Sequence, residues 1–216
     1  MNKDMILYYQ ERAKEYERIY TKPERQEDIK LAAETLKHYF AGKEVLEIAC
    51  GTGFWTQFIA ETAKSVFATD INDTVIDIAR AKGLPKNVQF HVADMYKNHG
   101  KQFEELFGGF IFSHILKQDR KIFFEKIRGL ISEKGQIVLM DNRYVEGSNH
   151  PITETDEIGN TFQTRSLDDG SVHKVLKNFP EEDELRSLVK SFADDVRYVG
   201  SEFFWILAFR LKPGNL

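Results

Sequence analysis

The residues of this sequence that could do chemistry begin with a glycine-rich turn. Residues 45–49, Val-Leu-Glu-Ile-Ala, are typical of a buried strand and carry one acidic side chain, Glu47. Residues 50–53, Cys-Gly-Thr-Gly, follow as a turn that leads into a helix. Because such a turn brings backbone N–H groups and a helix N-terminus close to a bound molecule, the pattern predicts a site for a nucleotide-like ligand.

Two acidic residues further along the chain extend this site. Asp70 and Asp94 each follow an apolar run that is predicted to be a strand. Ligands of open α/β sheets bind beyond the carboxyl ends of the strands. We therefore expect both carboxylates to lie near Gly51 and Gly53, where the missing side chains leave room for a ligand to approach the backbone.

The elements that must position these residues alternate between strand and helix. Apolar patterns predict strands at 44–49, 65–69, 88–92, 110–113 and 136–140, and helices at 55–63, 74–82 and 119–131. Strands separated by helices indicate right-handed crossovers and a parallel sheet that is covered on both faces.

The N-terminal segment is predicted to be helical. Tyrosines and small apolar residues at helical spacing favour an amphipathic helix over residues 1–20. Residues 21–24, Thr-Lys-Pro-Glu, are a helix-start signal for a second helix, which ends at Gly42.

The alternation breaks after residue 142. A polar loop over 143–160 precedes a hairpin around the turn at 168–171, Asp-Asp-Gly-Ser. A last helix follows residues 178–181, and two closely joined strands, which should be antiparallel, end the chain at 196–199 and 203–211.

The turn at 49–53, with Glu47, Asp70 and Asp94 around it, resembles the cofactor-binding core of class I S-adenosylmethionine-dependent methyltransferases. The resemblance covers residues 43–142 by motif and the rest by the order of elements. It implies that the cofactor is S-adenosylmethionine and that the product is S-adenosylhomocysteine. Ala49 is a departure, since the family usually has glycine there.

The resemblance also implies roles for individual residues. Asp70 would accept hydrogen bonds from both ribose hydroxyls and Asp94 from the adenine amine, with Met95 against the ring, while Glu47 would orient the methionyl amino group. The implied cofactor-binding residues are Glu47, Ala49, Cys50, Gly51, Gly53, Trp55, Asp70, Ile71, Asp94, Met95 and Ser113.

The predicted fold is a single doubly wound α/β domain, residues 1–216. We expect a seven-stranded, mostly parallel sheet with an antiparallel last strand, a helical lid and a β-hairpin insert after strand five. The parts are a lid at 1–42, a cofactor-binding core at 43–142, a substrate-side insert at 143–179, and a closing helix and strands at 180–216. The segment from Asp141 to Phe179 also resembles that of a set of uncharacterised bacterial methyltransferases.

Acceptor residues are expected at the carboxyl ends of the later strands and on the lid. His114 stands where the family places residues near the transferring methyl, and it either acts as a general base or caps the next helix. His173 in the hairpin is a second candidate base, or an exposed histidine without a role. The candidate substrate-binding residues are Tyr9, Arg12, Tyr16, Tyr20, Arg143 and Tyr144.

For Arg143 and for the lid tyrosines, a structural role is an alternative to substrate binding. Arg143 would clamp an acidic substrate or pair with a neighbouring carboxylate. The lid tyrosines would cover a sulfonium or form a packing face.

A metal ion is not expected. Asp141 and Asn142 look like the metal-binding pair of catechol-type O-methyltransferases, but those enzymes need a further aspartate where this chain has Ser113. Divalent cations require several oxygen ligands, and this set is incomplete.

Composition narrows the class of protein. The 216 residues carry a net charge of −4 without a block of Lys or Arg, which argues against nucleic acid as the main partner. Cys50 is the one cysteine, which excludes an intrachain disulfide and suits a reducing compartment. The start of the chain lacks the apolar core of a secretory signal, and no apolar run is long enough to span a bilayer. We expect a cytoplasmic monomer or homodimer.

The sequence therefore predicts a transferase that methylates a small-molecule acceptor by in-line displacement. An RNA or protein methyltransferase is an alternative, which a basic, open surface beside the strand ends would favour. A non-catalytic protein that binds S-adenosylmethionine or a partner is another, which a filled acceptor side would favour. An NAD-dependent oxidoreductase fits the spacing from Gly53 to Asp70, but Phe54 and Trp55 would crowd a pyrophosphate and Thr56 replaces a small residue.

Overall fold

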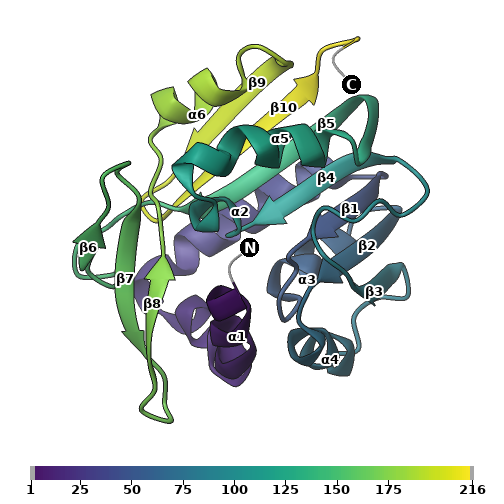
Figure 1. The fold of residues 1–216 in the computed structure, drawn as a ribbon. Coiled ribbons are helices and arrows are strands. Elements are labelled where there is room, and N and C mark those ends of the chain that lie inside the picture. The colour runs from purple at the N-terminus through teal and green to yellow at the C-terminus, as the bar shows by residue number, and fades with distance from the viewer. Residues whose placement is uncertain (1–2, 215–216) are drawn as a thin grey trace.

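Seven strands form the central sheet of the computed structural model, which describes residues 3–214 (Figure 1). The order is β3-β2-β1-β4-β5-β10-β9; the first five strands are parallel, and β10 is antiparallel to both of its neighbours. The bounds are β1 Glu44–Ile48, β2 Ser65–Asp70, β3 Val88–Val92, β4 Phe103–Gly109, β5 Ile131–Asn142, β9 Ala193–Gly200 and β10 Phe204–Leu211. The predicted sheet is confirmed, and residues 1–2 and 215–216 of the predicted domain lie outside the described residues.

Helices cover both faces of this sheet. Apolar residues of α2 (Gln26–Phe40), α3 (Phe54–Ala60) and α4 (Asp73–Ala81) share one core with the sheet. Those of α5 (Arg120–Arg128) and α6 (Glu182–Val189) share a core on the other face (Figure 1). Between residues 3 and 214 we find no helix with the length and apolar character that a membrane span requires.

The apolar residues of helix α2 are the ones that it buries against the sheet. Its apolar residues recur every three or four positions, so they form one stripe, and Leu36 and Phe40 on this stripe are fully buried. Although α2 lies within the predicted lid at 1–42, it packs against the central sheet. The part of the chain that covers the strand ends is residues 3–25, which we call the N-terminal segment.

The N-terminal segment is a series of short helices. It contains α1 (Lys3–Glu11) and the 3₁₀ turns η1 (Arg12–Lys14), η2 (Tyr16–Thr21) and η3 (Pro23–Arg25). The prediction of one regular helix over 1–20 is wrong beyond Glu11, because tertiary contacts shape the later turns. Tyr20 stacks on Phe54, with ring centroids 3.8 Å apart, and accepts a hydrogen bond from Trp55.

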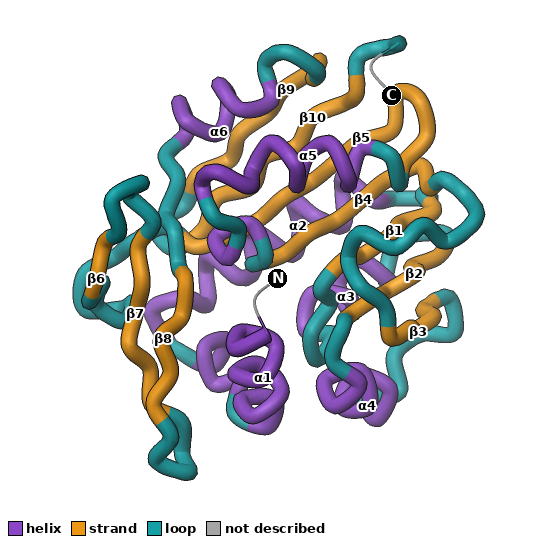
Figure 2. The backbone as a smooth tube through the Cα atoms, viewed as in Figure 1, coloured by secondary structure: helices purple, strands orange, loops and turns teal. Residues whose placement is uncertain are grey.

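A separate three-stranded sheet contains the predicted hairpin. Strands β7 (Thr161–Ser166) and β8 (Val172–Leu176) pair around Gly170, whose φ of +85° suits the turn. The short β6 (Glu154–Thr155) joins β7, so the predicted loop at 143–160 includes a strand. Figure 2 shows α1 between this sheet and α4, in front of the carboxyl ends of the central strands.

The predicted strand at 110–113 is wrong. The fourth strand is β4 at 103–109, and the later residues form a bend and the 3₁₀ turn η4 (Phe112–His114). Strand β4 contains two acidic residues and two glycines. Both residue types are depleted in strands, so its sequence does not predict a strand. The structure explains Gly108, since a Cβ there would lie 3.0 Å from Leu139.

Gly53 begins α3 at a crowded point. Its φ is +76°, and an added Cβ would lie 3.2 Å from the Cβ of Ala79 and 3.4 Å from Phe90. Glycine is therefore required both for the backbone conformation and for the approach of α3 to α4 and β3.

We predict that Gly53→Ala lowers the free energy of unfolding by more than Gly83→Ala does. Gly83 also has a positive φ, +63°, but nothing lies within 4 Å of an added Cβ, so its substitution adds backbone strain alone, of about 1 kcal/mol. Gly53→Ala adds crowding to a strain of similar size. Urea unfolding of both variants measures the difference, and equal destabilisation would contradict it.

Candidate active site

The ends of β1, β2 and β3 surround one cavity, as the sequence predicted. We call it the strand-end cavity. Six predicted cofactor-binding residues line it: Ala49, Gly51, Asp70, Ile71, Asp94 and Met95. Ile6, Tyr9 and Tyr16 of the N-terminal segment line the same cavity.

Asp70 is anchored by backbone donors. Its Oδ2 accepts a hydrogen bond from the Gly51 N–H at 2.9 Å, and its Oδ1 accepts one from the Asn72 N–H at 2.9 Å. A carboxylate has about four acceptor positions, so two remain for hydroxyl groups of a ligand. Burial raises the pKa of Asp70, which these backbone hydrogen bonds partly oppose.

A smaller cavity adjoins the glycine turn. We call it the turn cavity; Glu47, Cys50 and Trp55 line it, together with Ala49 and Gly51. Glu47 is 2% exposed, and within the described part of the chain its Oε2 has no hydrogen-bond partner. Burial raises the pKa of this carboxyl to about 8. A buried acceptor without a donor is costly, so the site suits a ligand that brings a donor.

Strained backbone flanks both cavities. Ala49 at the end of β1 has a φ of +53°, and Phe110 after β4 has a φ of +58°. Residues other than glycine adopt this conformation at a cost of about 1–3 kcal/mol, typically at functional sites. At position 49, where the resembling family has glycine, the chain thus keeps the left-handed conformation with an alanine.

Two predicted cofactor residues lie elsewhere. Gly53 lines neither cavity and serves the helix packing described above. Ser113 is buried behind the site, where its backbone N–H donates to Asp141.

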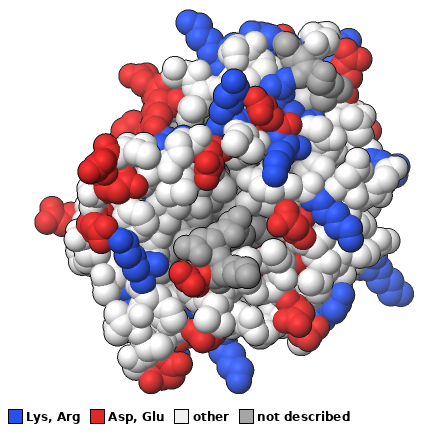
Figure 3. All heavy atoms as spheres, viewed as in Figure 1, with Lys and Arg blue, Asp and Glu red and all other residues white. Residues whose placement is uncertain are grey.

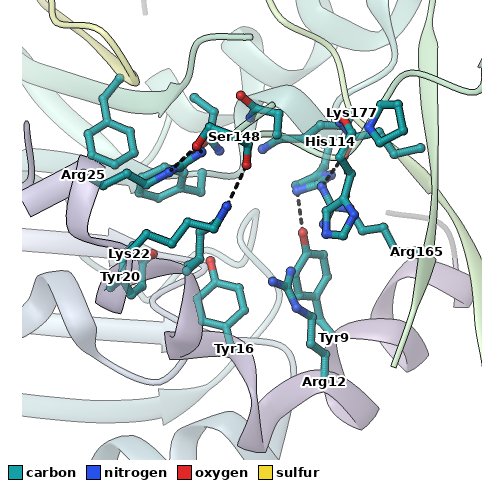
Figure 4. Close-up of a pocket in the computed structure, with 18 of the residues that line it drawn as sticks. Tyr9, Arg12, Tyr16, Tyr20, Lys22, Arg25, His114, Ser148, Arg165 and Lys177 are labelled. Carbon is teal, nitrogen blue, oxygen red and sulfur yellow. Dashed lines mark hydrogen bonds between the residues drawn. The ribbon is translucent and has the colours of Figure 1, made fainter. Parts of the chain in front are cut away.

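A third, larger space of about 300 Å³ lies beside the strand-end cavity (Figure 4). We call it the cationic cavity. Four of the candidate substrate-binding residues line it: Tyr9, Arg12, Tyr16 and Tyr20. Tyr9 and Tyr16 also line the strand-end cavity, as do Phe110 and His114, so the two spaces meet at these four side chains.

The charge of this cavity was not predicted. In addition to Arg12, four cationic side chains line this cavity: Lys22, Arg25, Arg165 and Lys177. No Asp or Glu is among its lining residues. Arg165 and Gln163 alternate along β7 on its buried face, a pattern of polar residues that could have marked them. No comparable sequence pattern marks Lys177 as a residue of the cavity.

His114 lies at the junction in a defined tautomer. Its Nδ1 is 2.6 Å from the carbonyl oxygen of Leu176, which only accepts, so Nδ1 carries the proton. Its Nε2 therefore accepts from the Tyr9 hydroxyl, also at 2.6 Å. Burial, and then the positive charge of Lys177, holds the pKa of His114 well below its ordinary value, so the ring is neutral.

A buried ion pair joins the hairpin to the central sheet. Lys177 Nζ donates to Asp141 Oδ1 at 2.9 Å and to Ser113 Oγ at 2.6 Å. The other oxygen of Asp141 accepts from the Ser113 N–H at 2.8 Å. Both oxygens of Asp141, the residue that looks like part of the catechol-type metal-binding pair, are therefore bound by the chain's own donors.

Three predicted residues lie outside the cationic cavity. His173, on strand β8 of the hairpin, contacts Ser171 and also Glu11 at the end of α1. Arg143 donates to the carbonyl of Ser201, and Tyr144 packs against Phe179. The structure brings none of the three to the junction.

Comparison with known proteins agrees with this geometry. A family model described as "Methyltransferase domain" matches residues 45–135. An uncharacterized methyltransferase of Bacillus pumilus is 28% identical over 112 residues, which are 51% of this chain and 52% of that protein. The DhpI–SAH complex structure superimposes with a TM-score of 0.81 at 24% identity, covering 97% of this chain and 96% of that one. The DhpI–SAM–HEP complex has a TM-score of 0.75 at 25% identity and covers 95% of each chain.

Residues 45–135 match a methyltransferase domain, and together with the shared fold this supports a class I S-adenosylmethionine-dependent methyltransferase. The chain spans about half the length of the curated Bacillus relative that it matches.

The residues present fit the cofactor of that class. Gly51 leaves open space beside the strand-end cavity, because nothing lies within 4 Å of an added Cβ. Asp70 keeps free acceptor positions for ribose hydroxyls, and the unpartnered oxygen of Glu47 suits the methionyl ammonium.

We predict that Asp70→Ala weakens the binding of S-adenosylhomocysteine by about 1–3 kcal/mol, because the carboxylate that would accept from the ribose hydroxyls is removed. Asp77→Ala on α4 is the matched control, since Asp77 is exposed and lines no cavity. Calorimetric titration measures both variants. An unchanged affinity in a folded Asp70→Ala protein would remove Asp70 from the site.

The pKa of Glu47 predicts a pH dependence of binding. Below about pH 8 the free protein holds Glu47 protonated, whereas an ammonium group favours the carboxylate, so binding releases a proton. Between pH 6 and pH 8 the affinity for S-adenosylhomocysteine should rise by up to about tenfold per pH unit. Titration of Glu47→Gln should give a flat profile over this range, and a steep profile in that variant would assign the effect to another group.

Proposed function

We propose that this methyltransferase transfers a methyl group from S-adenosylmethionine to a small acceptor that carries a negative charge. The observation that supports this most directly is the meeting of the strand-end cavity with a cation-lined cavity. A volume of about 300 Å³ is in the range of small-molecule sites. The cations of its wall favour acids over neutral molecules of similar size.

The residues at the junction have distinct tasks. When bound, S-adenosylmethionine supplies an electrophilic methyl group on a positively charged sulfur. Tyr16 and Phe110 line all three cavities and present aromatic faces, which suit a cation. In-line displacement depends on alignment, so the walls of the cationic cavity serve mainly to orient the acceptor.

His114 is a weak base in this setting. Its lowered pKa leaves it neutral, but a group that binds protons weakly cannot draw one from an ordinary alcohol. An acceptor atom that is already ionised needs no base. We therefore assign His114 the task of holding Tyr9 at the junction through the hydrogen bond to Nε2.

Two observations disfavour the alternative functions. Figure 3 shows acidic and basic side chains interspersed on the face drawn, whereas an RNA methyltransferase needs a broad basic surface. The acceptor side is an open cavity, whereas a non-catalytic binding protein would have it filled.

The proposed function is tested with methyl-labelled S-adenosylmethionine and two sets of small molecules. One set contains carboxylic acids and phosphate esters, and the other contains neutral amides and alcohols of matched size. We expect label to transfer to members of the acidic set. Transfer confined to neutral molecules, or to RNA or protein, would contradict the proposal.

With an acceptor in hand, His114→Gln separates orientation from base catalysis. We expect kcat to fall by no more than about tenfold, because glutamine can still accept the hydrogen bond from Tyr9. Loss of a general base typically costs about 10²–10⁴-fold. A loss of that size, with the acidic limb of the kcat/KM profile removed, would make His114 a base.

A further inference from the structure

Arg165 on β7 is a buried cation without a counter-charge. It is 7% exposed, and its guanidinium donates to Gln163 Oε1 at 3.1 and 2.6 Å and to the Tyr8 hydroxyl at 3.4 Å. Within residues 3–214 no carboxylate lies at ion-pair distance from it. Burial of an unpaired charge costs several kcal/mol in general, so this arginine suits a missing anion.

Arg12 on η1 lines the same cavity. Its guanidinium lies 5.8 Å from the ring centroid of Tyr8, and that of Arg165 lies 5.9 Å from the same centroid. Arg12 too has no carboxylate at ion-pair distance among the described residues. Burial lowers the pKa of Lys177 and the charge of Asp141 opposes this, while the positive charges of Arg165 and Arg12 lower it further, so the cations act on one another. Figure 4 shows both arginines beside Tyr9 and His114.

The two arginines belong to two elements that cap the central sheet. Arg12 belongs to the N-terminal segment and Arg165 to the hairpin. These elements are joined outside the cationic cavity, where Arg18 Nη1 donates to Asp168 Oδ1 at 2.8 Å and the Asp168 N–H donates to Glu15 at 3.2 Å. Near the cationic cavity the like charges of Arg12 and Arg165 oppose the same contact.

The N-terminal segment is also a wall of the strand-end cavity. Ile6, Tyr9 and Tyr16 line that cavity, on either side of Arg12 in the sequence. Polar contacts tie the segment to the central domain, among them the bond from Asn72 Nδ2 to the Ile6 carbonyl at 3.1 Å and the bonds that Glu17 accepts from Thr52 and Lys82. Anything that draws Arg12 toward Arg165 therefore also presses Tyr9 and Tyr16 over the cofactor position.

We propose that Arg12 and Arg165 form an oxyanion site, and that an anion bound there closes the N-terminal segment against the hairpin and thereby tightens cofactor binding. The inference rests on the proposed function, because the anion is the charged group of the acceptor. A guanidinium pair is suited to the task, since each fork can bind two oxygens of one carboxylate or phosphate. Linkage makes the effect reciprocal: the cofactor tightens anion binding by the same factor.

Inorganic phosphate is the probe for this coupling. S-adenosylhomocysteine is titrated into the full chain in saturating phosphate and in sodium chloride of equal ionic strength. We expect phosphate to lower the Kd by at least about fivefold, the lower end of typical couplings between sites. Hydrogen exchange should slow in the N-terminal segment and in β7 when phosphate is added.

Variants assign the effect to the arginine pair. The ratio of the two Kd values is measured within each variant, so a change in basal affinity cancels. Arg165→Gln should abolish the ratio, whereas Arg197→Gln should keep it, since Arg197 pairs with Asp195 on the exposed edge strand β9. Arg165→Lys, which retains the charge without the fork, should keep part of it.

The outcomes are separable. Binding of S-adenosylhomocysteine that is indifferent to phosphate, or equally enhanced in Arg165→Gln, would overturn the coupling and leave the proposed function standing. Failure to bind S-adenosylhomocysteine under any of these conditions would overturn both.

Discussion

The ion pair between Lys177 and Asp141 is the contact on which the arrangement of the site depends. It is buried in full and ties the exit of the hairpin to the end of β5 and to the turn after β4. Removal of one partner from such a pair typically costs about 3–5 kcal/mol, because the other charge stays buried. Through this contact the hairpin becomes a wall of the active site instead of a projecting ribbon.

The same connection orients His114. Ser113 contacts Lys177, and the residue after Ser113 contacts the residue before Lys177, through His114 Nδ1 and the Leu176 carbonyl. The Asn178 N–H also donates to the Ser113 carbonyl at 2.9 Å. A run of backbone and side-chain bonds between two short segments thus selects the histidine tautomer and directs Nε2 to the junction of the cavities.

Local strain and unpaired groups gather at this edge of the sheet. Ala49 and Phe110 have a left-handed backbone. Among residues 3–214, one oxygen of Glu47 has no hydrogen-bond donor and Arg165 has no carboxylate partner. Each feature lowers the stability of the ligand-free fold. Their concentration around three adjoining cavities indicates that ligands, and not packing, account for them.

Sequence alone determined the cofactor side of this protein, and tertiary structure decided the acceptor side. Glu47, Gly51, Asp70 and Asp94 lie at or just beyond the ends of three parallel strands. Parallel topology brings such ends to one edge, so local patterns were enough to predict that these residues line adjoining cavities. Strand β4 escaped prediction because its two glutamates and two glycines suit a strand only when neighbours pair on both sides.

The cationic cavity is different, because Arg12, Arg165 and Lys177 come from separate segments of the chain. Their approach depends on which face the hairpin turns inward and on how the N-terminal segment bends after Glu11. Two contacts between residues distant in sequence determine these orientations. They are the buried ion pair between Lys177 and Asp141 and the stacking of Tyr20 on Phe54. The periodicity of a single segment does not record contacts of this kind. The grouping of cationic side chains around one cavity could therefore be seen only in the folded chain.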